Sequence, residues 1–126
     1  PLVLTVSENG RVRGWTMEGE LELPEEKAEL LGSDHPFLDE VTEDLMSLCH
    51  HPNAGQFLIS GWRRDGRPVT FPVENGSHGG PGPEETSGFA ILPRRIFRHW
   101  REKGYLRPSD LRREATAVLG TGHNRA

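Results

Sequence analysis

Residues 74–85 (ENGSHGGPGPEE) constrain the fold more than any other stretch of the chain. They contain four glycines and two prolines, a density that excludes a helix or a regular strand. The runs 69–73 before them and 89–92 after them are β-branched, aromatic and aliphatic, and each predicts a strand. His78 is therefore expected in a loop, at the exit of a strand. Catalytic and metal-binding side chains are commonly held on loops that a rigid sheet fixes in place.

Length and composition limit the class of protein. With 126 residues, 33% of them hydrophobic, and a mean hydropathy of −0.63, the chain can form one domain with a modest core. This hydrophobic content is low for a domain that folds by itself, so we expect a partner or further polypeptide to cover part of its apolar surface. The chain starts at Pro1 and an apolar run follows without a cap or turn, which indicates a piece of a longer polypeptide.

Localisation is constrained only in part by the sequence. No apolar run approaches the roughly 20 residues that span a bilayer, and no signal peptide is recognisable, so we expect a soluble chain without a membrane segment. The single cysteine, Cys49, excludes an internal disulfide and is expected to pack as a small apolar residue. It leaves the compartment undetermined, with the cytoplasm slightly favoured.

Charge is distributed unevenly, although the net charge is only −4. Residues 18–44 contain eleven acidic side chains and a single basic one, Lys27, whereas residues 94–113 hold eight of the fifteen Lys and Arg. One interpretation is a basic binding face. The other is a solvated helix face, because the basic side chains of residues 94–103 alternate with apolar ones at helical spacing. The acidic total and the lack of a recognisable nucleic-acid module argue against nucleic-acid binding.

The predicted elements are those of an α+β chain with short strands, hairpins and about four helices. Residues 2–7 and 11–17 flank an Asn-Gly turn, which predicts a hairpin. A short helix is predicted over 24–31, ended by Gly32, and a second helix is predicted from its cap Asp34 to His51-Pro52, with one apolar face formed by Phe37, Leu38, Val41, Leu45, Leu48 and Cys49. A strand over 56–60 is expected to pair with the strand over 69–73. Two more helices are predicted, one from Pro93 to about Lys103 and a last one after Pro108, capped by Ser109, with an inward face of Leu111, Ala115, Val118 and Leu119.

Residues 51–93 resemble a known family. The stretches HPNAGQFLISGW (51–62) and VTFPVENGSHGGPGPEETSGFAILP (69–93) are similar to the C-terminal part of alkaline phosphatase superfamily hydrolases, the group that includes type I phosphodiesterases, nucleotide pyrophosphatases and sulfatases. The similarity is closest to bacterial members described as phosphodiesterase or phosphatase-like, and it is loose outside these residues. Family members often have an acid where this chain has Gln56, which puts in doubt any polar contact made there.

The resemblance implies a role for His78. In the family, a strand leads to a Gly-x-His-Gly element whose imidazole binds one of two zinc ions, and residues 76–79 (GSHG) match this element. The family's nucleophile and remaining metal ligands lie upstream of the matched region, and no segment of this chain reproduces them. The resemblance therefore implies one metal ligand, His78, and no catalytic residue within this chain.

Fold and function follow as expectations from the same resemblance. They are an α+β fragment of an alkaline phosphatase-like α/β fold, and the C-terminal part of a metal-dependent phosphoester hydrolase, inactive as an isolated fragment. Its partners would be the remainder of the parent chain and a small-molecule phosphoester. Three parts are expected: a hairpin with acidic helices over 1–50, strands and the histidine loop over 51–93, and basic helices with a tail over 94–126.

Simpler interpretations stay open for the same residues. His78 can be a solvent-exposed loop histidine, and Gly79 and Gly80 can serve only a turn that needs positive φ. The alternative function is a non-catalytic interaction or regulatory module, which would bind a protein partner through exposed Trp15, exposed Trp62 and the basic helix.

Overall fold

A computed structural model describes residues 2–7, 9–73, 79–92 and 104–122 of the chain. The chain divides into two units, Pro1–Gly88 and Phe89–Ala126, and each is described by itself. The first unit contains β1 (Leu2–Val6), β2 (Val12–Trp15), β3 (Glu20–Leu23), α1 (Lys27–Leu31), α2 (Leu38–Cys49), β4 (Leu58–Ser60) and α3 (Pro83–Thr86), and the second contains α5 (Pro108–Gly122). The described chain is thus of the α+β class.

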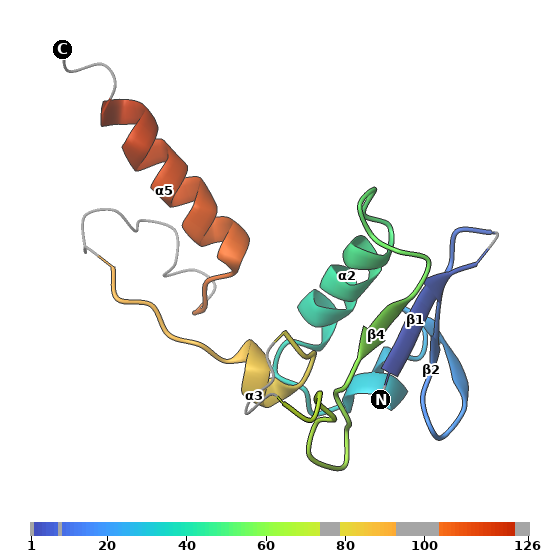
Figure 1. Ribbon diagram of the computed structural model, residues 1–126. Helices are drawn as coiled ribbons and strands as arrows, with labels where there is room; N and C mark the ends of the chain where they lie inside the picture. Colours follow the sequence, from blue (N-terminus) through green and yellow to red (C-terminus); the bar gives the residue numbers. More distant parts are fainter. Residues whose placement is uncertain (1, 8, 74–78, 93–103, 123–126) are drawn as a thin grey trace. The chain divides into compact units, whose positions relative to one another are not determined.

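The first unit is built on a four-stranded antiparallel sheet in the order β3-β2-β1-β4 (Figure 1). Strands β1 and β2 form the hairpin predicted from the Asn-Gly turn, with Val3 opposite Trp15 and Val6 opposite Val12. Strand β4 returns after α2 to pair with the other edge of β1, so that Leu4 lies opposite Leu58. The strand predicted over 56–60 is confirmed for residues 58–60, but the predicted pairing with 69–73 is wrong, because β4 pairs with β1.

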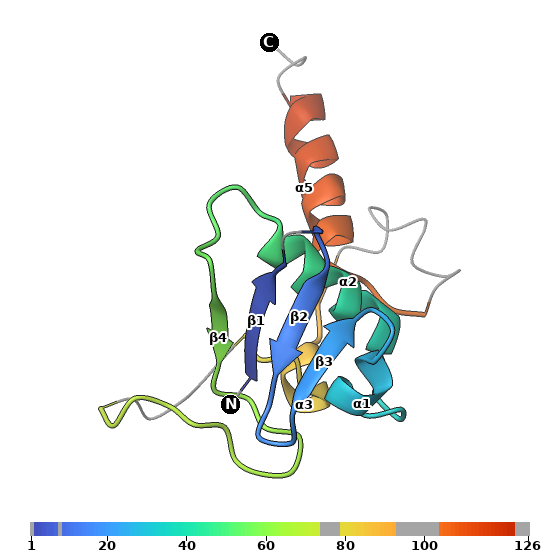
Figure 2. The same ribbon diagram turned by 90° about the vertical axis from the view of Figure 1, so that its right-hand side faces the viewer.

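Helices α1 and α2 cover one face of the sheet (Figure 2). Side chains alternate along a strand, so the buried residues of β1, β2 and β3 all point towards the helices. A single hydrophobic core results, and it contains Leu2, Leu4, Val12, Leu21, Leu23, Leu30, Leu31, Val41, Leu45 and Trp62, with Phe37, Leu38, Met46, Cys49 and Leu58 partly buried against it.

The second helix fits its predicted face in most positions. Val41 and Leu45 are buried, whereas Leu48, in the last turn of the helix, is half exposed. The helix ends at Cys49, one residue before His50 and two before His51-Pro52, as predicted from the proline. The predicted cap is wrong: Phe37 is the N-cap residue and no side chain caps the helix, so Asp34 has no such role.

Other predictions of helix ends are also corrected by the structure. Helix α1 begins at Lys27, since residues 24–26 form a turn in which the Glu26 N–H donates to the Glu22 carbonyl at 2.9 Å. Helix α5 begins at Pro108, and Ser109 lies inside it, because the Arg107 carbonyl already accepts from the N–H groups of Asp110 and Leu111. The inward face predicted for this helix is exposed at Ala115, Val118 and Leu119.

Two predicted strands are absent from the described residues. Residues 69–73 and 89–92 have no strand pairing, and their large apolar side chains, Phe71 and Phe89 among them, are exposed. One hydrogen bond, from the Val69 N–H to the Gly61 carbonyl at 2.8 Å, holds the first of these segments near the end of β4. Conversely, β3 was not predicted from the sequence. Its alternating Glu-Leu-Glu-Leu pattern over 20–23 indicates a half-buried strand.

The helix predicted over 93–103 lies outside the described residues. In the part of the chain that the structure describes, no helix has the length and apolar character needed to cross a membrane.

Candidate functional site

The proposed metal ligand, His78, lies outside the described residues, but the segment that follows it is described. This segment, residues 79–86, is called here the glycine arm. It ends in the short helix α3, and its Pro81 and Gly82 are buried although neither belongs to a strand or a helix. Such burial without regular structure requires specific contacts with the rest of the unit.

The first contact joins the glycine arm to the connection between α1 and α2. The His35 Nε2 lies 2.9 Å from the Pro81 carbonyl oxygen, and the two residues are 46 positions apart in the sequence. The other ring nitrogen, Nδ1, accepts a hydrogen bond from the Phe37 N–H at 3.0 Å. The proton is therefore on Nε2, which donates it to Pro81, and this imidazole is buried with both nitrogens satisfied.

The second contact is a close approach of the arm to an indole ring. Trp62 is only 6% exposed, and a β-carbon on Gly82 would overlap its Nε1 atom. Only glycine permits the backbone to pass this close to the ring. The exposure of Trp62 expected from the sequence is thus wrong, because the glycine arm and the core enclose the indole.

The arm is also closed by its own hydrogen bonds. The Glu85 carboxylate accepts from the Gly80 N–H at 2.7 Å, and the Gly82 carbonyl accepts from the N–H groups of Glu85 and Thr86 at 3.1 Å. Gly79 has a φ of +78°, a conformation that favours glycine, and a β-carbon there would meet none of the other described residues within 4 Å. With respect to the described part of the chain, the arm therefore begins with open space at Gly79, and it ends as a compact, hydrogen-bonded turn.

A hollow of about 230 Å³ lies on the sheet unit near Trp62. Two arginines line it, but both already have partners: the Arg64 guanidinium donates to the Glu29 carbonyl at 2.9 Å, and Arg63 lies 3.7 Å from Asp65. Its other lining residues are Leu2, Thr16, Met17, Glu18 and Leu30. The mixture of charges selects no class of ligand.

A second hollow of about 220 Å³ adjoins Cys49 between α2 and the segment before β4. Burial raises the pKa of the Cys49 thiol, so the thiolate that would act as a nucleophile or metal ligand is disfavoured. Cys49 packs against the hydrophobic core, as predicted from the sequence.

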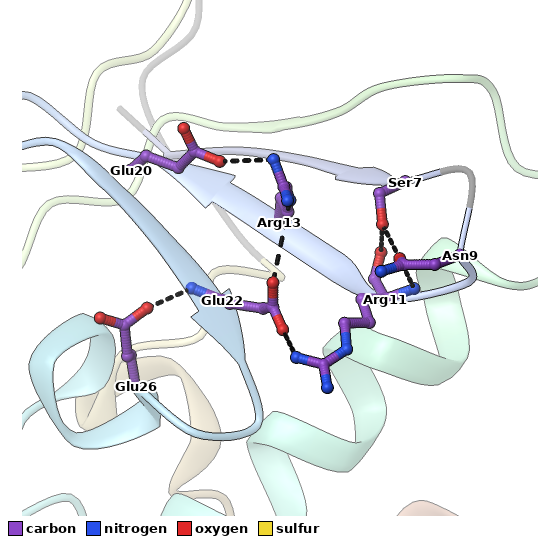
Figure 3. Close-up of polar contacts among 7 residues, drawn as sticks. All are labelled: Ser7, Asn9, Arg11, Arg13, Glu20, Glu22 and Glu26. Atoms are coloured by element: carbon purple, nitrogen blue, oxygen red, sulfur yellow. Dashed lines mark hydrogen bonds and ion pairs between the residues drawn. The ribbon is translucent and has the colours of Figure 1, made fainter.

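Polar side chains gather on the outer face of the sheet, away from the helices (Figure 3). Arg11 pairs with Glu22, and Arg13 contacts Glu20 at 3.0 Å and Glu22 at 3.8 Å. Arg13 faces Glu22 directly in the register of β2 and β3. Because these charges compensate each other across neighbouring strands, they stabilise the pairing of the strands.

Two further histidines lie at the end of α2. The ring nitrogens of His50 face the carbonyl oxygens of Met46, at 2.8 Å, and Gly10, at 2.9 Å. These two acceptors, Met46 first, raise the pKa of His50 above its ordinary value. His51 Nδ1 accepts from the Asn53 N–H at 3.2 Å. Both rings are thus engaged by backbone groups.

Across residues 2–7, 9–73, 79–92 and 104–122, no three side chains of His, Cys, Asp or Glu gather in a way that could hold a metal ion. The contact of His35 with Pro81 and the burial of Trp62 were not predicted, because neither leaves a local signal in the sequence. No family model, curated protein or solved structure matches the chain.

Proposed function

We propose that the chain is the C-terminal part of a metal-dependent phosphoester hydrolase with an alkaline phosphatase-like α/β fold. In this proposal His78 binds one of two zinc ions in the parent protein. Two features support it: the Gly-Ser-His-Gly element of residues 76–79, and the fixed position of the glycine arm that follows this element. The second feature is the structural observation that carries the proposal, since a metal ligand must be held in place by its scaffold.

The donor chemistry of the chain fits this partial role. An imidazole nitrogen is a common zinc ligand, and zinc sites need three or four ligands. The described residues supply no group of three. The parent's nucleophile and remaining ligands therefore come, in this proposal, from polypeptide outside this sequence. When bound, zinc would act as a Lewis acid towards the phosphoryl group and activate the nucleophile.

The residues of this chain would have defined tasks in that site. His78 would donate one nitrogen to the metal. Gly79 would leave open space next to it, because a β-carbon added there meets no other described residue within 4 Å. His35, Trp62 and Glu85 would hold the arm while substrate binds and product leaves.

The test is the substitution His78→Ala in the full-length parent protein. We expect about two bound zinc ions in the unmodified protein, and loss of metal together with phosphodiesterase activity in the variant. Metal content is measured by inductively coupled plasma mass spectrometry, and activity with a chromogenic phosphodiester. His51→Ala is the matched control, because this exposed ring accepts from the Asn53 N–H at the end of α2, and its loss should leave both readouts unchanged. Unchanged zinc and turnover in His78→Ala would refute the proposal.

A second candidate, the interaction module, is favoured by one observation. Ile59, Val3 and Trp15 form a row across the outer face of β4, β1 and β2, and Ile59 is 74% exposed. Of the two tryptophans that this hypothesis expects to be exposed, Trp62 is buried and Trp15 is partly exposed. A partner captured equally well by the unmodified chain and by the double variant Trp15→Ser, Ile59→Ser would count against this surface.

A further inference from the structure

The glycine arm depends on one side chain from a distant part of the sequence. His35 lies in the connection between α1 and α2, only 6% exposed, and its Nε2 reaches the Pro81 carbonyl. Pro81 has no N–H to offer and stands in the middle of the arm, so its carbonyl is the backbone group through which this residue can be tied down. A buried carbonyl that loses its donor becomes costly, which makes this bond specific.

The imidazole performs two tasks that no shorter or purely apolar side chain could combine. Its Nδ1 accepts from the N–H of Phe37, the N-cap residue of α2, while its Nε2 donates to Pro81. The position of the arm is thereby tied to the start of α2, and α2 packs on β1 in the centre of the sheet.

Two further contacts flank this bond along the arm. The Gly80 N–H is held by the Glu85 carboxylate within the arm itself, and Gly82 lies against the Trp62 indole outside it. The three contacts involve three consecutive residues of the arm. The contacts of Pro81 and Gly82 define the position of the arm on the first unit, which is called here its seat, and His35 provides the side-chain hydrogen bond in this seat.

We propose that His35 is a positioning residue that seats the glycine arm through the Pro81 carbonyl. The seating itself stands on the described contacts alone. Its purpose rests on the proposed function: the arm begins at Gly79, directly after His78, so in the parent protein the seat would give a metal ligand at this position a constant direction of approach.

A pair of amide side chains separates the two tasks of the imidazole. In His35→Gln, the side-chain NH₂ stands near the position of Nε2 and can still donate to Pro81. In His35→Asn, the side-chain oxygen stands near Nδ1 and can still accept from Phe37, but the donor to Pro81 is lost. The two variants have similar polarity, so a difference between them reports on the bond to the arm.

The first experiment measures amide hydrogen exchange by NMR in the full 126-residue chain. We expect His35→Asn to accelerate exchange at Gly80, Glu85 and Thr86 about tenfold, the effect of losing one buried hydrogen bond. The Val41 amide, which donates to the Phe37 carbonyl in the first turn of α2, should stay protected. His35→Gln should keep the arm protected. Equal protection of the arm in both variants would overturn the proposal that His35 seats the arm. Loss of protection at Val41 and in the arm together in His35→Asn would also overturn it.

A second substitution disturbs the same seat from the other side. In Gly82→Ala, the added methyl group overlaps the Trp62 Nε1 atom, so the arm must move away. We expect the same three amides to exchange faster, whereas Gly88→Ala, where a β-carbon meets nothing within 4 Å, should leave them unchanged. Unaltered exchange in Gly82→Ala would also overturn the proposed seating of the arm against Trp62.

The second experiment tests the purpose of the seat in the full-length parent protein. We expect His35→Asn to weaken zinc affinity about tenfold, within the range known for groups that orient metal ligands, and His35→Gln to restore most of it. A released arm with unchanged zinc affinity, in a protein that loses zinc on His78→Ala, would overturn the positioning role. Retention of zinc in His78→Ala would instead refute the proposed function. The seating of the arm would then be decided by the hydrogen-exchange experiment alone.

Discussion

The sheet with its two helices and the segment 61–88 are stabilised in different ways. In the sheet and its helices, nine buried side chains from five elements share one core with Trp62, so each contributes a part of the stability. In residues 61–88, α3 is the one regular element described, and single contacts fix the backbone: Gly61 with Val69, Gly82 with Trp62, and His35 with Pro81. Apolar burial is distributed over many atoms, whereas a close approach or a hydrogen bond is local.

This difference bears on function. A site that needs a constant geometry can be placed on a loop only where specific contacts replace regular secondary structure. The glycine arm has such contacts, and the outer segment 69–73, with its exposed Phe71 and Val73, is connected to β4 through Val69. Within the segment 61–88, the glycine arm is therefore attached to the rest of the unit by more contacts than residues 69–73.

The largest expected effect belongs to the core. Leu4 has no exposed surface in the centre of the sheet, so Leu4→Ala removes buried methyl groups and leaves a cavity. We expect the free energy of unfolding to fall by about 2–5 kcal/mol, measured by urea denaturation followed by circular dichroism. Ile59→Ala, on the opposite face of the same sheet, is the control and should change it by less than about 0.5 kcal/mol. Similar losses in both would contradict the assignment of the two faces.

A smaller and more local effect is expected at Gly61. A β-carbon at this position would overlap the carbonyl oxygen of Val69, a backbone atom that cannot rotate away. We expect Gly61→Ala to cost about 1–3 kcal/mol and to expose the Val69 amide to faster hydrogen exchange. Gly55→Ala provides the comparison, because its nearest contact would be 3.7 Å from the Phe57 carbonyl, an ordinary distance. Protection of Val69 that is unchanged in Gly61→Ala would show that the two backbones are not in contact.

The smallest expected effect concerns His50, which joins the end of α2 to the β1–β2 turn. Both of its ring nitrogens face carbonyl oxygens, so the charged imidazolium, with two donors, makes the better pair of hydrogen bonds, and its pKa is raised. A raised pKa in the folded state means that this contribution is complete below the ordinary value of about 6.5 and is lost as the pH rises through the folded value. The position at a helix C-terminus also favours the cation.

The measurement compares the unfolding midpoint of the unmodified chain with that of His50→Gln between about pH 5 and pH 9. We expect the destabilisation caused by the substitution to be largest at the acidic end and to decline towards the alkaline end. A destabilisation that grows with rising pH would contradict the predicted sign.

Local patterns in the sequence predicted several elements of the sheet unit and missed others. The Asn-Gly turn predicted the β1–β2 hairpin, and the spacing of Val41 and Leu45 predicted the buried face of α2, because both signals lie within a few residues of each other. Residues 69–73 have the composition of a strand but no partner strand, and strand formation requires pairing with a distant segment. The same limit explains the choice of β1 as the partner of β4.

By itself, the sequence determined the α+β composition, the turns at glycine and proline, and the motif that makes His78 a candidate metal ligand. Only the tertiary structure decided that Trp62 is buried, that Asp34 does not cap α2, and that His35 meets Pro81. The physical reason is the range of the interactions. Turn formation and helix periodicity depend on neighbours along the chain, whereas the seat of the glycine arm depends on residues that only folding brings into hydrogen-bonding distance.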